Sequence, residues 1–519
     1  MVPSELPIYR PENFYREDPY FAQLMEGYLP PGEFAWAREY FSAMGKLAAQ
    51  KISPLVLPSD QNPPILQNFD GQGNRIDQIQ LHESYREIAR LSIESGLIGW
   101  GYSPEFKQNN RRYGPLLKFG LGYLYSQAGS VYYCPICMTD GTLQLIAGHG
   151  SEELKKKWVP RLTNMDFAKF SDGGMYLTEI QGGSDVGANT CRAYQENGQW
   201  RVSGKKWFCS NAGSQTAMVL ARPEDAPAGT AGLGLFLVPL HLENGTRNGI
   251  YIDRLKPKLG TCEMPTAEIT LEGAIGFPVG KLSEGFAYMT EMLNLSRSYN
   301  AVWSIGLMQR AYLEARYYAE HRQAFGRPIQ LYPLVAKTIL EMKQDSERAL
   351  GLVLETIHYW DRMERGHGSK EDEILLRLLT PVIKFYTAEK CMEAAHRAIE
   401  IFGGNGCVED FPIAKILRDS QILAIWEGTA NILSLDILRV MKKNQAQQVF
   451  LKVYGDKVEK LTQGERKSLL QERLKKLEDS FSTVDQGRDG VGGQRDCRAL
   501  GVELANFIED FAWKSHAHS

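Results

Sequence analysis

The hydrophobic and polar positions along the chain change their period twice. From about residue 35 to 165, stretches such as HESYREIARLSIESGLIGW and LLKFGLGYLYSQAGS repeat apolar residues at helical spacing. From about 173 to 278, short apolar runs such as AMVLA and LGLFLVPL alternate with turn sequences such as ENGQ and ENGTRNG, which is typical of strands joined by turns. Helical spacing returns from about 284, and the stretches 446–482 and about 497–514 predict further helices. The pattern predicts a mostly α fold with a β insert.

These changes of period divide the chain into four regions. We expect an N-terminal helical domain over 1–172, a β domain over 173–278, a C-terminal helical bundle over 279–441 and a helical extension over 442–519. Within the bundle, KFYTAEKCMEAAHRAIEIFGG places apolar residues along one helical face, and Gly403 and Gly404 are expected to end that helix.

Composition and charge narrow the class of protein. A chain of 519 residues with 43% hydrophobic residues can bury a large core. The 59 basic and 62 acidic residues give a net charge of −3, so no global charge attracts nucleic acid or an anionic membrane. Eight scattered cysteines favour a reducing compartment, and the sequence shows neither a signal-peptide pattern nor a run of 18 apolar residues. We therefore expect a cytoplasmic protein without a membrane span.

Several common catalytic signatures are missing from the sequence. It contains no GxGxxG turn after a strand and no GxxxxGK[ST] loop, the two usual cradles for nucleotide phosphates, and no GxSxG elbow of a serine hydrolase. Cys134 and Cys137 form a CxxC, but no second pair stands at zinc-site spacing. Core packing is the favoured role for these two thiols, and no metal is expected.

One carboxylate, Glu427, stands among apolar residues in QILAIWEGTANIL. An ionised acid is rarely placed in such company without a partner or a task. Two interpretations are open. Glu427 could cap the helix predicted for TANILSLDILRVM, or it could be a base in a dry pocket, where desolvation would raise its pKa toward the working range.

Three longer motifs carry a family resemblance. They are MYLTEIQGGSDVGANTCRA (175–193), HRQAFGRPI (321–329) and EIFGGNGCVEDFPIAKILRDSQILAIWEGTANI (400–432). With the α–β–α order, they resemble the acyl-CoA dehydrogenase family over roughly residues 35 to 441. YCPICMT and FDGQGNRIDQIQLHESY resemble its alkylation-response (AidB-like) branch, which also carries a C-terminal helical extension. The resemblance implies an N-terminal helical domain, a central β-barrel-like domain and a C-terminal helical bundle.

The resemblance also implies a reaction. Such enzymes remove a proton from the carbon next to a thioester while the flavin of FAD accepts a hydride from the following carbon. Glu427 matches the family's catalytic base, and Gly428 would let the backbone approach the thioester. Relatives that place the base on the preceding helix use the slot that is Ser296 here, and a serine cannot serve. On the substrate side the resemblance implies Ser184, Asn294, Arg297 and Gly428.

The flavin contacts implied by the resemblance come from several motifs. In the β domain they are Leu177, Thr178, Gly183, Ser184, Trp207 and either Cys209 or Ser210. Arg322 and Phe325 are expected to reach the FAD of a neighbouring subunit, joined by Glu400, Gly403 and Gly404, while Thr429 and Asn431 match adenosine-side contacts. This sharing implies a homotetramer. Glu400 replaces a common Gln and Asn294 a common Asp, which weakens the diphosphate and CoA assignments.

Three functions remain open. The first is an acyl-CoA dehydrogenase; the second is a flavin oxidase on another small molecule, which would need Asp where Glu427 stands. The third is an AidB-like protective or nucleic-acid-associated protein. Residues 441–519 contain 14 Lys and Arg against 12 Asp and Glu, a net of +2, and Lys and Glu are interleaved, so nucleic-acid binding is disfavoured but stays open. Acyl-chain length and electron acceptor are not predicted.

Overall fold

The structure is a computed structural model that describes residues 6–486 and 491–513. The chain forms two compact units. Unit 1 comprises Met1–Gln50, Tyr113–Gly129 and Arg297–Ser519, and unit 2 comprises Lys51–Arg112 and Ser130–Ser296. Each unit therefore combines segments that are far apart in the sequence.

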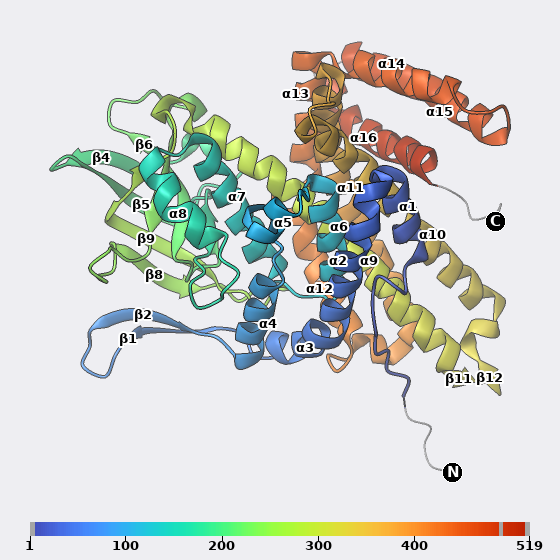
Figure 1. The fold of residues 1–519 in the computed structure, drawn as a ribbon, viewed down its shortest axis with the longest axis horizontal. Helices are drawn as coiled ribbons and strands as arrows, with labels where there is room; N and C mark the ends of the chain where they lie inside the picture. Colours follow the sequence, from blue (N-terminus) through green and yellow to red (C-terminus); the bar gives the residue numbers. More distant parts are fainter. Residues whose placement is uncertain (1–5, 487–490, 514–519) are drawn as a thin grey trace. The chain divides into compact units, whose positions relative to one another are not determined.

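Unit 1 is almost entirely helical (Figure 1). Its elements are α1 (Pro19–Tyr28), α2 (Pro31–Leu47), α6 (Pro115–Ser126), most of α9 (Gly285–His321), β11 (Gln323–Ala324), β12 (Arg327–Pro328), α10 (Pro333–Glu364), α11 (Lys370–Phe402), α12 (Pro412–Ile425), α13 (Ala430–Asn444), α14 (Ala446–Glu459), α15 (Glu465–Gln486) and α16 (Val491–Ala512).

Local signals in the sequence explain where the central helix α11 starts and stops. Ser369 and Asp372 form a reciprocal capping box at its N-terminus, which satisfies backbone N–H groups that lack helical partners. At the other end the helix stops at Phe402, and Gly403 follows with φ of 60°. The predicted glycine stop is confirmed. Between these ends α11 packs against α10, α12 and α13. The segment around Glu427 joins α12 to α13, so α11 contacts the helices on both sides of it.

Unit 2 combines helices with the β domain. Its elements are α3 (Ser53–Asp60), β1 (Ile65–Phe69), β2 (Arg75–Gln80), α4 (Glu83–Glu94), α5 (Pro104–Gln108), α7 (Tyr133–His149), α8 (Glu152–Leu162), β3 (Gly173–Tyr176), β4 (Arg192–Glu196), β5 (Gln199–Ser210), β6 (Thr216–Pro223), β7 (Gly234–Pro239), β8 (Ile250–Leu255), β9 (Thr266–Ile275) and β10 (Phe277–Pro278). The sheet follows the order β10-β7-β6-β4-β5-β9-β8, and β3 pairs with β6 in parallel.

The β domain has its own apolar core, in which Val202, Val219, Phe236 and Ile269 are fully buried. Strand β5 departs from regular alternation, because its register against β9 shifts between Lys206 and Cys209. A bulge of this kind lets consecutive side chains turn to one face of the sheet. The mostly α fold with a β insert is confirmed.

Two parts of the helical prediction need correction. The stretch 35–165 contains the hairpin β1–β2, whose alternating ILQNF and RIDQIQ flank the turn DGQGN, with Gly73 at φ of 84°. The stretch 446–482 is helical as expected and holds two helices, α14 and α15, which are separated around Gly464 at φ of 158°. The final predicted helix begins earlier than expected, at Val491, and residue 514 lies outside the described residues.

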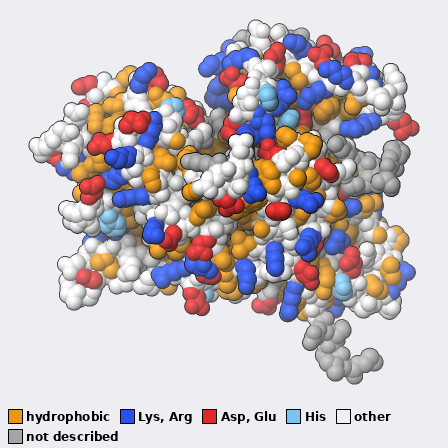
Figure 2. Space-filling model, viewed as in Figure 1, with side chains coloured by type: hydrophobic (Ala, Val, Ile, Leu, Met, Phe, Trp, Pro, Cys, Tyr) orange, Lys and Arg blue, Asp and Glu red, His pale blue; other side chains and the backbone are white. Residues whose placement is uncertain are grey.

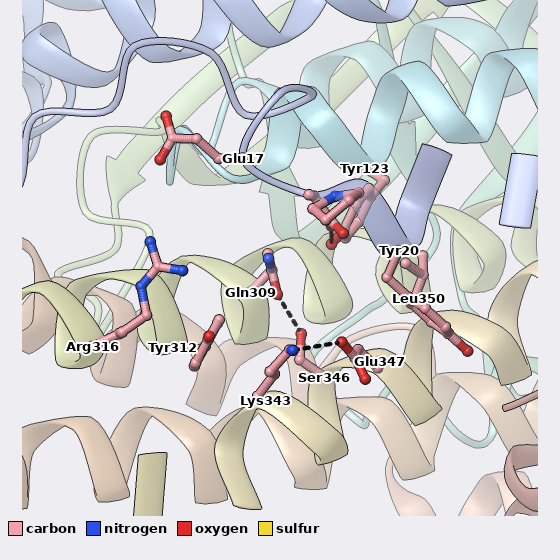
Figure 3. Close-up of a pocket in the computed structure, with 12 residues that line it drawn as sticks. Glu17, Tyr20, Tyr123, Gln309, Tyr312, Arg316, Lys343, Ser346, Glu347 and Leu350 are labelled. Atoms are coloured by element: carbon pink, nitrogen blue, oxygen red, sulfur yellow. Dashed lines mark hydrogen bonds and ion pairs between the residues drawn. The ribbon is translucent and has the colours of Figure 1, made fainter. Parts of the chain in front are cut away.

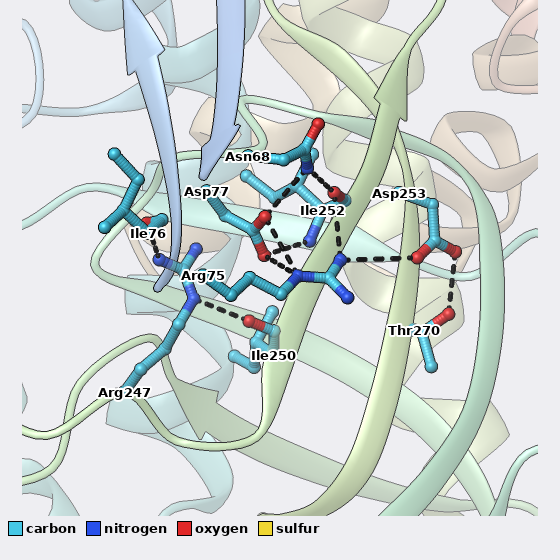
Figure 4. A network of polar contacts seen from close by, with 9 residues as sticks. All are labelled: Asn68, Arg75, Ile76, Asp77, Arg247, Ile250, Ile252, Asp253 and Thr270. Carbon is cyan, nitrogen blue, oxygen red and sulfur yellow. Dashed lines mark hydrogen bonds and ion pairs between the residues drawn. The ribbon is translucent and has the colours of Figure 1, made fainter. Parts of the chain in front are cut away.

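Polar side chains attach the hairpin to β8 (Figure 4). Asp77 accepts hydrogen bonds from Asn68 Nδ2 at 2.8 Å and from the Ile252 backbone N–H at 2.9 Å, and Arg75 Nε lies 3.1 Å from its carboxylate. Asn68 also donates to the Ile252 carbonyl at 2.7 Å. These bonds to a buried carboxylate fix the hairpin without a large apolar interface. In the described parts of the chain, no helix has both the length and the apolarity that a membrane crossing needs.

Candidate functional site

Glu427 lies on a strained turn between α12 and α13. Its φ is 58°, and Gly428 follows with φ of 104°. A left-handed conformation is costly for a residue with a side chain and persists where the surroundings enforce it, most often at functional sites. The N-cap of α13 is Thr429, which makes no side-chain cap bond. Glu427 therefore lies two residues before the N-cap position of α13.

Two cationic side chains hold the backbone of this turn in unit 1. Lys384, from α11, donates from Nζ to the Gly428 carbonyl at 2.7 Å, and Arg297, from α9, donates from Nε to the Glu427 carbonyl at 3.2 Å. Lys384 is fully buried. Burial lowers the pKa of Lys384 to about 7, although the charge of Glu427 acts to raise it. The two consecutive carbonyls of the turn are thus each fixed by a long basic side chain.

Arg297 is itself held by a buried carboxylate, Asp436 on α13. Arg297 Nη1 lies 2.8 Å from Asp436 Oδ2, and Arg377 Nη2 lies 2.7 Å from Oδ1. Burial raises the pKa of Asp436, but hydrogen bonding and the charge of Arg377 outweigh it, so the pKa is lowered. Burial lowers the pKa of Arg297, and the charge of Asp436 acts against that shift. The structure therefore shows that Arg297 contacts the Glu427 carbonyl and Asp436. The resemblance implies a contact with CoA in addition.

The alternative position for a base is occupied by Ser296, which is buried in unit 2. Its hydroxyl accepts a hydrogen bond from the thiol of Cys137 at 3.3 Å. Asn294, two residues earlier, is half-buried. Neither side chain has a carboxylate that could take a proton at this position.

The predicted flavin loop in unit 2 joins β3 to β4 and is tied to β5. The Trp207 backbone N–H donates to the Thr178 carbonyl at 2.9 Å. Leu177 and Thr178 are half-buried, whereas Gly183 and Ser184 are exposed. Gly182 has φ of 126° and open space where a Cβ would stand, as a backbone that closely approaches a ligand requires.

The bulge in β5 decides which side chains face outward. Trp207 is half-buried, and Lys256 Nζ lies 3.7 Å from the centre of its ring. Cys209 points into the apolar core of the β domain, and burial raises the pKa of its thiol. Ser210 is half-buried and shares a 3.0 Å hydrogen bond with Thr266. Of the two predicted residues, Cys209 and Ser210, only Ser210 is exposed enough to contact a ligand.

The remaining predicted flavin residues lie in unit 1. Phe325 stands at the tip of the β11–β12 hairpin with φ of 50° and a side chain that is 96% exposed, beside half-buried Arg322. Glu400 is exposed at the end of α11, and nothing lies within 4 Å of a Cβ added to Gly403 or Gly404. Thr429 and Asn431 are exposed at the start of α13.

Each unit by itself offers features that an FAD would need. In unit 2, Trp207 offers an aromatic ring and Gly182 offers backbone that a ligand can approach; in unit 1, Gly403 and Gly404 offer such backbone. Among the described residues, no group of three or more His, Cys, Asp or Glu side chains is placed to hold a metal ion. The sequence reading missed Lys384 and Asp436, although a lone Lys in the apolar run LLTPVIKFYTA was a visible signal.

Each unit contains a cavity that is lined by residues other than the predicted site residues. In unit 1 a cavity of about 120 Å³ lies between α1, α6, α9 and α10, where Ser346 donates to Gln309 Oε1 at 2.9 Å and Lys343 faces Glu347 (Figure 3). It has room only for a few water molecules or a small ion. In unit 2 a cavity of about 660 Å³ lies beside the hairpin, with Tyr85 and Phe170 in its wall.

Comparisons with known proteins agree with the motifs. Residues 283–442 match "Acyl-CoA dehydrogenase, C-terminal domain", residues 174–274 match "Acyl-CoA dehydrogenase, middle domain", and residues 5–169 match "Adaptive response protein AidB N-terminal domain". The chain is 33% identical over 481 residues to acyl-CoA dehydrogenase family member 11 of Caenorhabditis elegans, covering 91% of this chain and 77% of the relative. It is 30% identical over 421 residues to the putative acyl-CoA dehydrogenase AidB of Escherichia coli, covering 79% and 75%.

Among solved structures, a crystal structure of Caenorhabditis elegans ACDH-11 in complex with C11-CoA is similar to this chain. The TM-score is 0.88 at 29% sequence identity, and the match covers 98% of this chain and 88% of that chain. The similarity thus includes the N-terminal helices and the C-terminal extension as well as the β domain.

Proposed function

Because this chain belongs to the acyl-CoA dehydrogenase family and its AidB-like branch, we propose that it is an FAD-dependent enzyme that desaturates an acyl-CoA thioester, with Glu427 as the base. The observation that carries the proposal is the Glu427–Gly428 turn. A carboxylate on a left-handed residue is held in place through two consecutive carbonyls by Arg297 and Lys384.

The chain's own groups account for proton removal. The base must reach the carbon next to the thioester with little freedom, because a misplacement of about 1 Å can cost 10²-fold in rate. Gly428 adopts the φ of 104° that the turn needs and that a residue with a side chain rarely adopts. The Glu427 N–H would donate to the thioester oxygen as negative charge develops. A bound flavin would supply the acceptor for the hydride of the neighbouring carbon.

For the substrate, we propose a medium-chain acyl-CoA, since a relative of 29% identity was solved with C11-CoA. Ser184, Asn294 and Arg297 are the chain's candidates on the CoA side. The flavin oxidase alternative would require Asp in place of Glu427, and the chain has Glu. The electron acceptor stays unassigned. We place the protein in the cytoplasm, in keeping with its eight free cysteine thiols.

The test is Glu427→Gln, which is close to isosteric and removes only the proton acceptor. Mixed anaerobically with C11-CoA and shorter and longer acyl-CoAs, wild-type protein should lose its flavin absorbance, and the variant should do so at least about 10²-fold more slowly with its flavin retained. Glu373→Gln, an exposed carboxylate on α11 paired with Lys370, is the matched control and should behave as wild type. A variant that reacts at nearly wild-type rate would remove Glu427 from the mechanism.

We further propose a homotetramer. Large apolar side chains lie exposed around the β11–β12 hairpin and the start of α10: Phe325 is 96% exposed, Leu334 82% and Leu331 59%. Contiguous exposure of this kind marks a surface that another chain covers, and Phe325 and Arg322 are the residues expected to reach a neighbour's FAD. Light scattering of the flavin-loaded protein should give four times the chain mass. A stable monomer with full flavin occupancy would contradict the shared site.

A further inference from the structure

A fully buried ion pair lies directly beside the loop that is expected to meet the flavin. In unit 2, Lys206 Nζ lies 2.8 Å from Glu179 Oε1, and the two side chains are 0% and 2% exposed. Each partner is the sequence neighbour of a predicted flavin contact: Glu179 follows Thr178, and Lys206 precedes Trp207. On β5, Lys206 points inward and Trp207 outward by the normal alternation of a strand, just before the bulge.

The carboxylate of Glu179 fastens both ends of the loop. Oε1 accepts from Lys206 Nζ and from the Cys191 N–H at 3.1 Å, and Oε2 accepts from the Thr190 N–H at 2.6 Å and the Thr190 hydroxyl at 2.8 Å. Residue 179 thus holds residues 190 and 191 and closes the loop between them. Burial raises the pKa of Glu179, but the charge of Lys206 and these hydrogen bonds bring it to about 2.

The ammonium of Lys206 extends the same contacts to the start of the loop. It donates to the Leu177 carbonyl at 3.4 Å, which also accepts from Asn189 Nδ2 at 3.0 Å. Gln181 Nε2 donates to Asn189 Oδ1 at 3.0 Å. The Trp207 N–H also donates to the Thr178 carbonyl, so the start of the loop is joined to β5 by this backbone bond and by the buried pair.

We propose that Glu179 and Lys206 are positioning residues that order the 177–191 loop and Trp207 for FAD before the flavin binds. The inference rests on the proposed function, because FAD is the ligand that the loop would receive. A buried ion pair can often be replaced by uncharged groups without loss of stability, whereas removal of one partner leaves a buried charge unpaired. The two roles, stability and loop ordering, can therefore be separated by comparing single and double substitutions.

The experiment measures FAD affinity and thermal unfolding of the apoprotein for three variants. Lys206→Met should lower both the melting temperature and the FAD affinity, the latter at least tenfold. The double variant Glu179→Gln with Lys206→Met should recover the melting temperature yet bind FAD at least tenfold more weakly than wild type, because an amide cannot accept the same set of bonds at both ends of the loop. Arg310→Met, which breaks a buried pair with Glu314 on α9, is the matched control and should leave FAD affinity unchanged.

A second measurement reports the accessibility of Trp207 in the apoprotein. Acrylamide quenching of tryptophan fluorescence is compared between each protein and a Trp207→Phe reference, and the difference is the Trp207 contribution. The Trp207 contribution should be quenched more readily in the double variant. Overturning results are a double variant that binds FAD within twofold of wild type, or an Arg310→Met variant that loses affinity as much as Lys206→Met. A wild-type protein that binds no FAD would instead refute the proposed function and is recognised by that measurement alone.

Discussion

Replacing Lys384 by Met should stabilise the protein at neutral pH and slow its reaction. Lys384 is fully buried on α11 and donates to the Gly428 carbonyl at 2.7 Å. Burial lowers its pKa to about 7 from an ordinary value of 10.5. Lys384 therefore binds its proton more tightly in the unfolded chain than in the folded chain. At pH 7 this difference corresponds to about 4 kcal/mol against folding.

Met removes that penalty and also removes the hydrogen-bond donor. Leaving the Gly428 carbonyl without this partner costs about 1–3 kcal/mol. The balance at pH 7 is a gain of roughly 1–3 kcal/mol for Lys384→Met. The penalty is fully present below pH 7 and disappears as the pH rises toward 10.5, by about 1.4 kcal/mol per unit. The advantage of the variant should therefore shrink steadily and vanish near pH 9.

Activity should change in the opposite direction, because the turn that carries Glu427 loses one of its two basic side chains. A loss of about 1.4 kcal/mol in positioning the base corresponds to a tenfold slower proton transfer, so flavin reduction by acyl-CoA should slow about tenfold or more. The assays are urea unfolding of apoprotein at several pH values and anaerobic stopped-flow absorbance. Lys390→Met, which breaks a partly exposed pair with Glu393 on the same helix and a 5.9 Å contact with the Tyr386 ring, should shift stability by less than about 1 kcal/mol. A stability difference that does not vary with pH would refute the reasoning.

Two further predictions concern the C-terminal extension. Burial raises the pKa of Glu509 to about 8, and its carboxyl lies 3.0 Å from the Tyr386 hydroxyl, which also lies 2.9 Å from Asn506 Oδ1. Because the folded pKa exceeds the ordinary 4.5, stability present below pH 4.5 is lost as pH rises through 8, so Glu509→Gln should raise the melting temperature at pH 8 and leave it unchanged at pH 4.5. Basic and acidic side chains lie among each other on the face in Figure 2, and residues 441–519 carry a net of only +2. A mobility-shift titration near physiological salt should therefore show no complex below roughly micromolar protein, and tighter, salt-sensitive binding would favour the nucleic-acid role.

The parts of the fold that the sequence predicted depend on local patterns. Periodicity predicts the helices and strands, and Gly403 ends α11 as its position indicates. The hairpin β1–β2 had a readable alternation and turn but was included in a helical region, because its strands are short and mostly polar. Its attachment to β8 through Asp77 joins residues 175 positions apart, which no local pattern encodes.

The residues of the candidate site also differ in whether a local sequence pattern could predict them. Glu427 and Gly428 could be predicted because their motif is contiguous, but their support comes from residues distant in sequence. Lys384 is 44 residues from Gly428, and Lys206 is 27 residues from Glu179. Lys384 is a single charge within an apolar run, whereas Lys206 follows the exposed Lys205 on β5. Both are buried, where an ammonium is costly unless it has partners.

The energetic cost of a buried ammonium indicates that the two lysines have a similar role. An apolar side chain of similar volume would pack at either position at lower energetic cost, so stability alone does not explain a buried ammonium there. Both contact backbone carbonyls beside predicted functional residues, Lys384 at Gly428 and Lys206 at Leu177. A buried lysine can hold a carbonyl in a conformation that the backbone would not otherwise keep, because its hydrogen bond is charge-assisted. Lys384 and Lys206 therefore mark two places where a buried ammonium supports the backbone of a segment predicted to be functional.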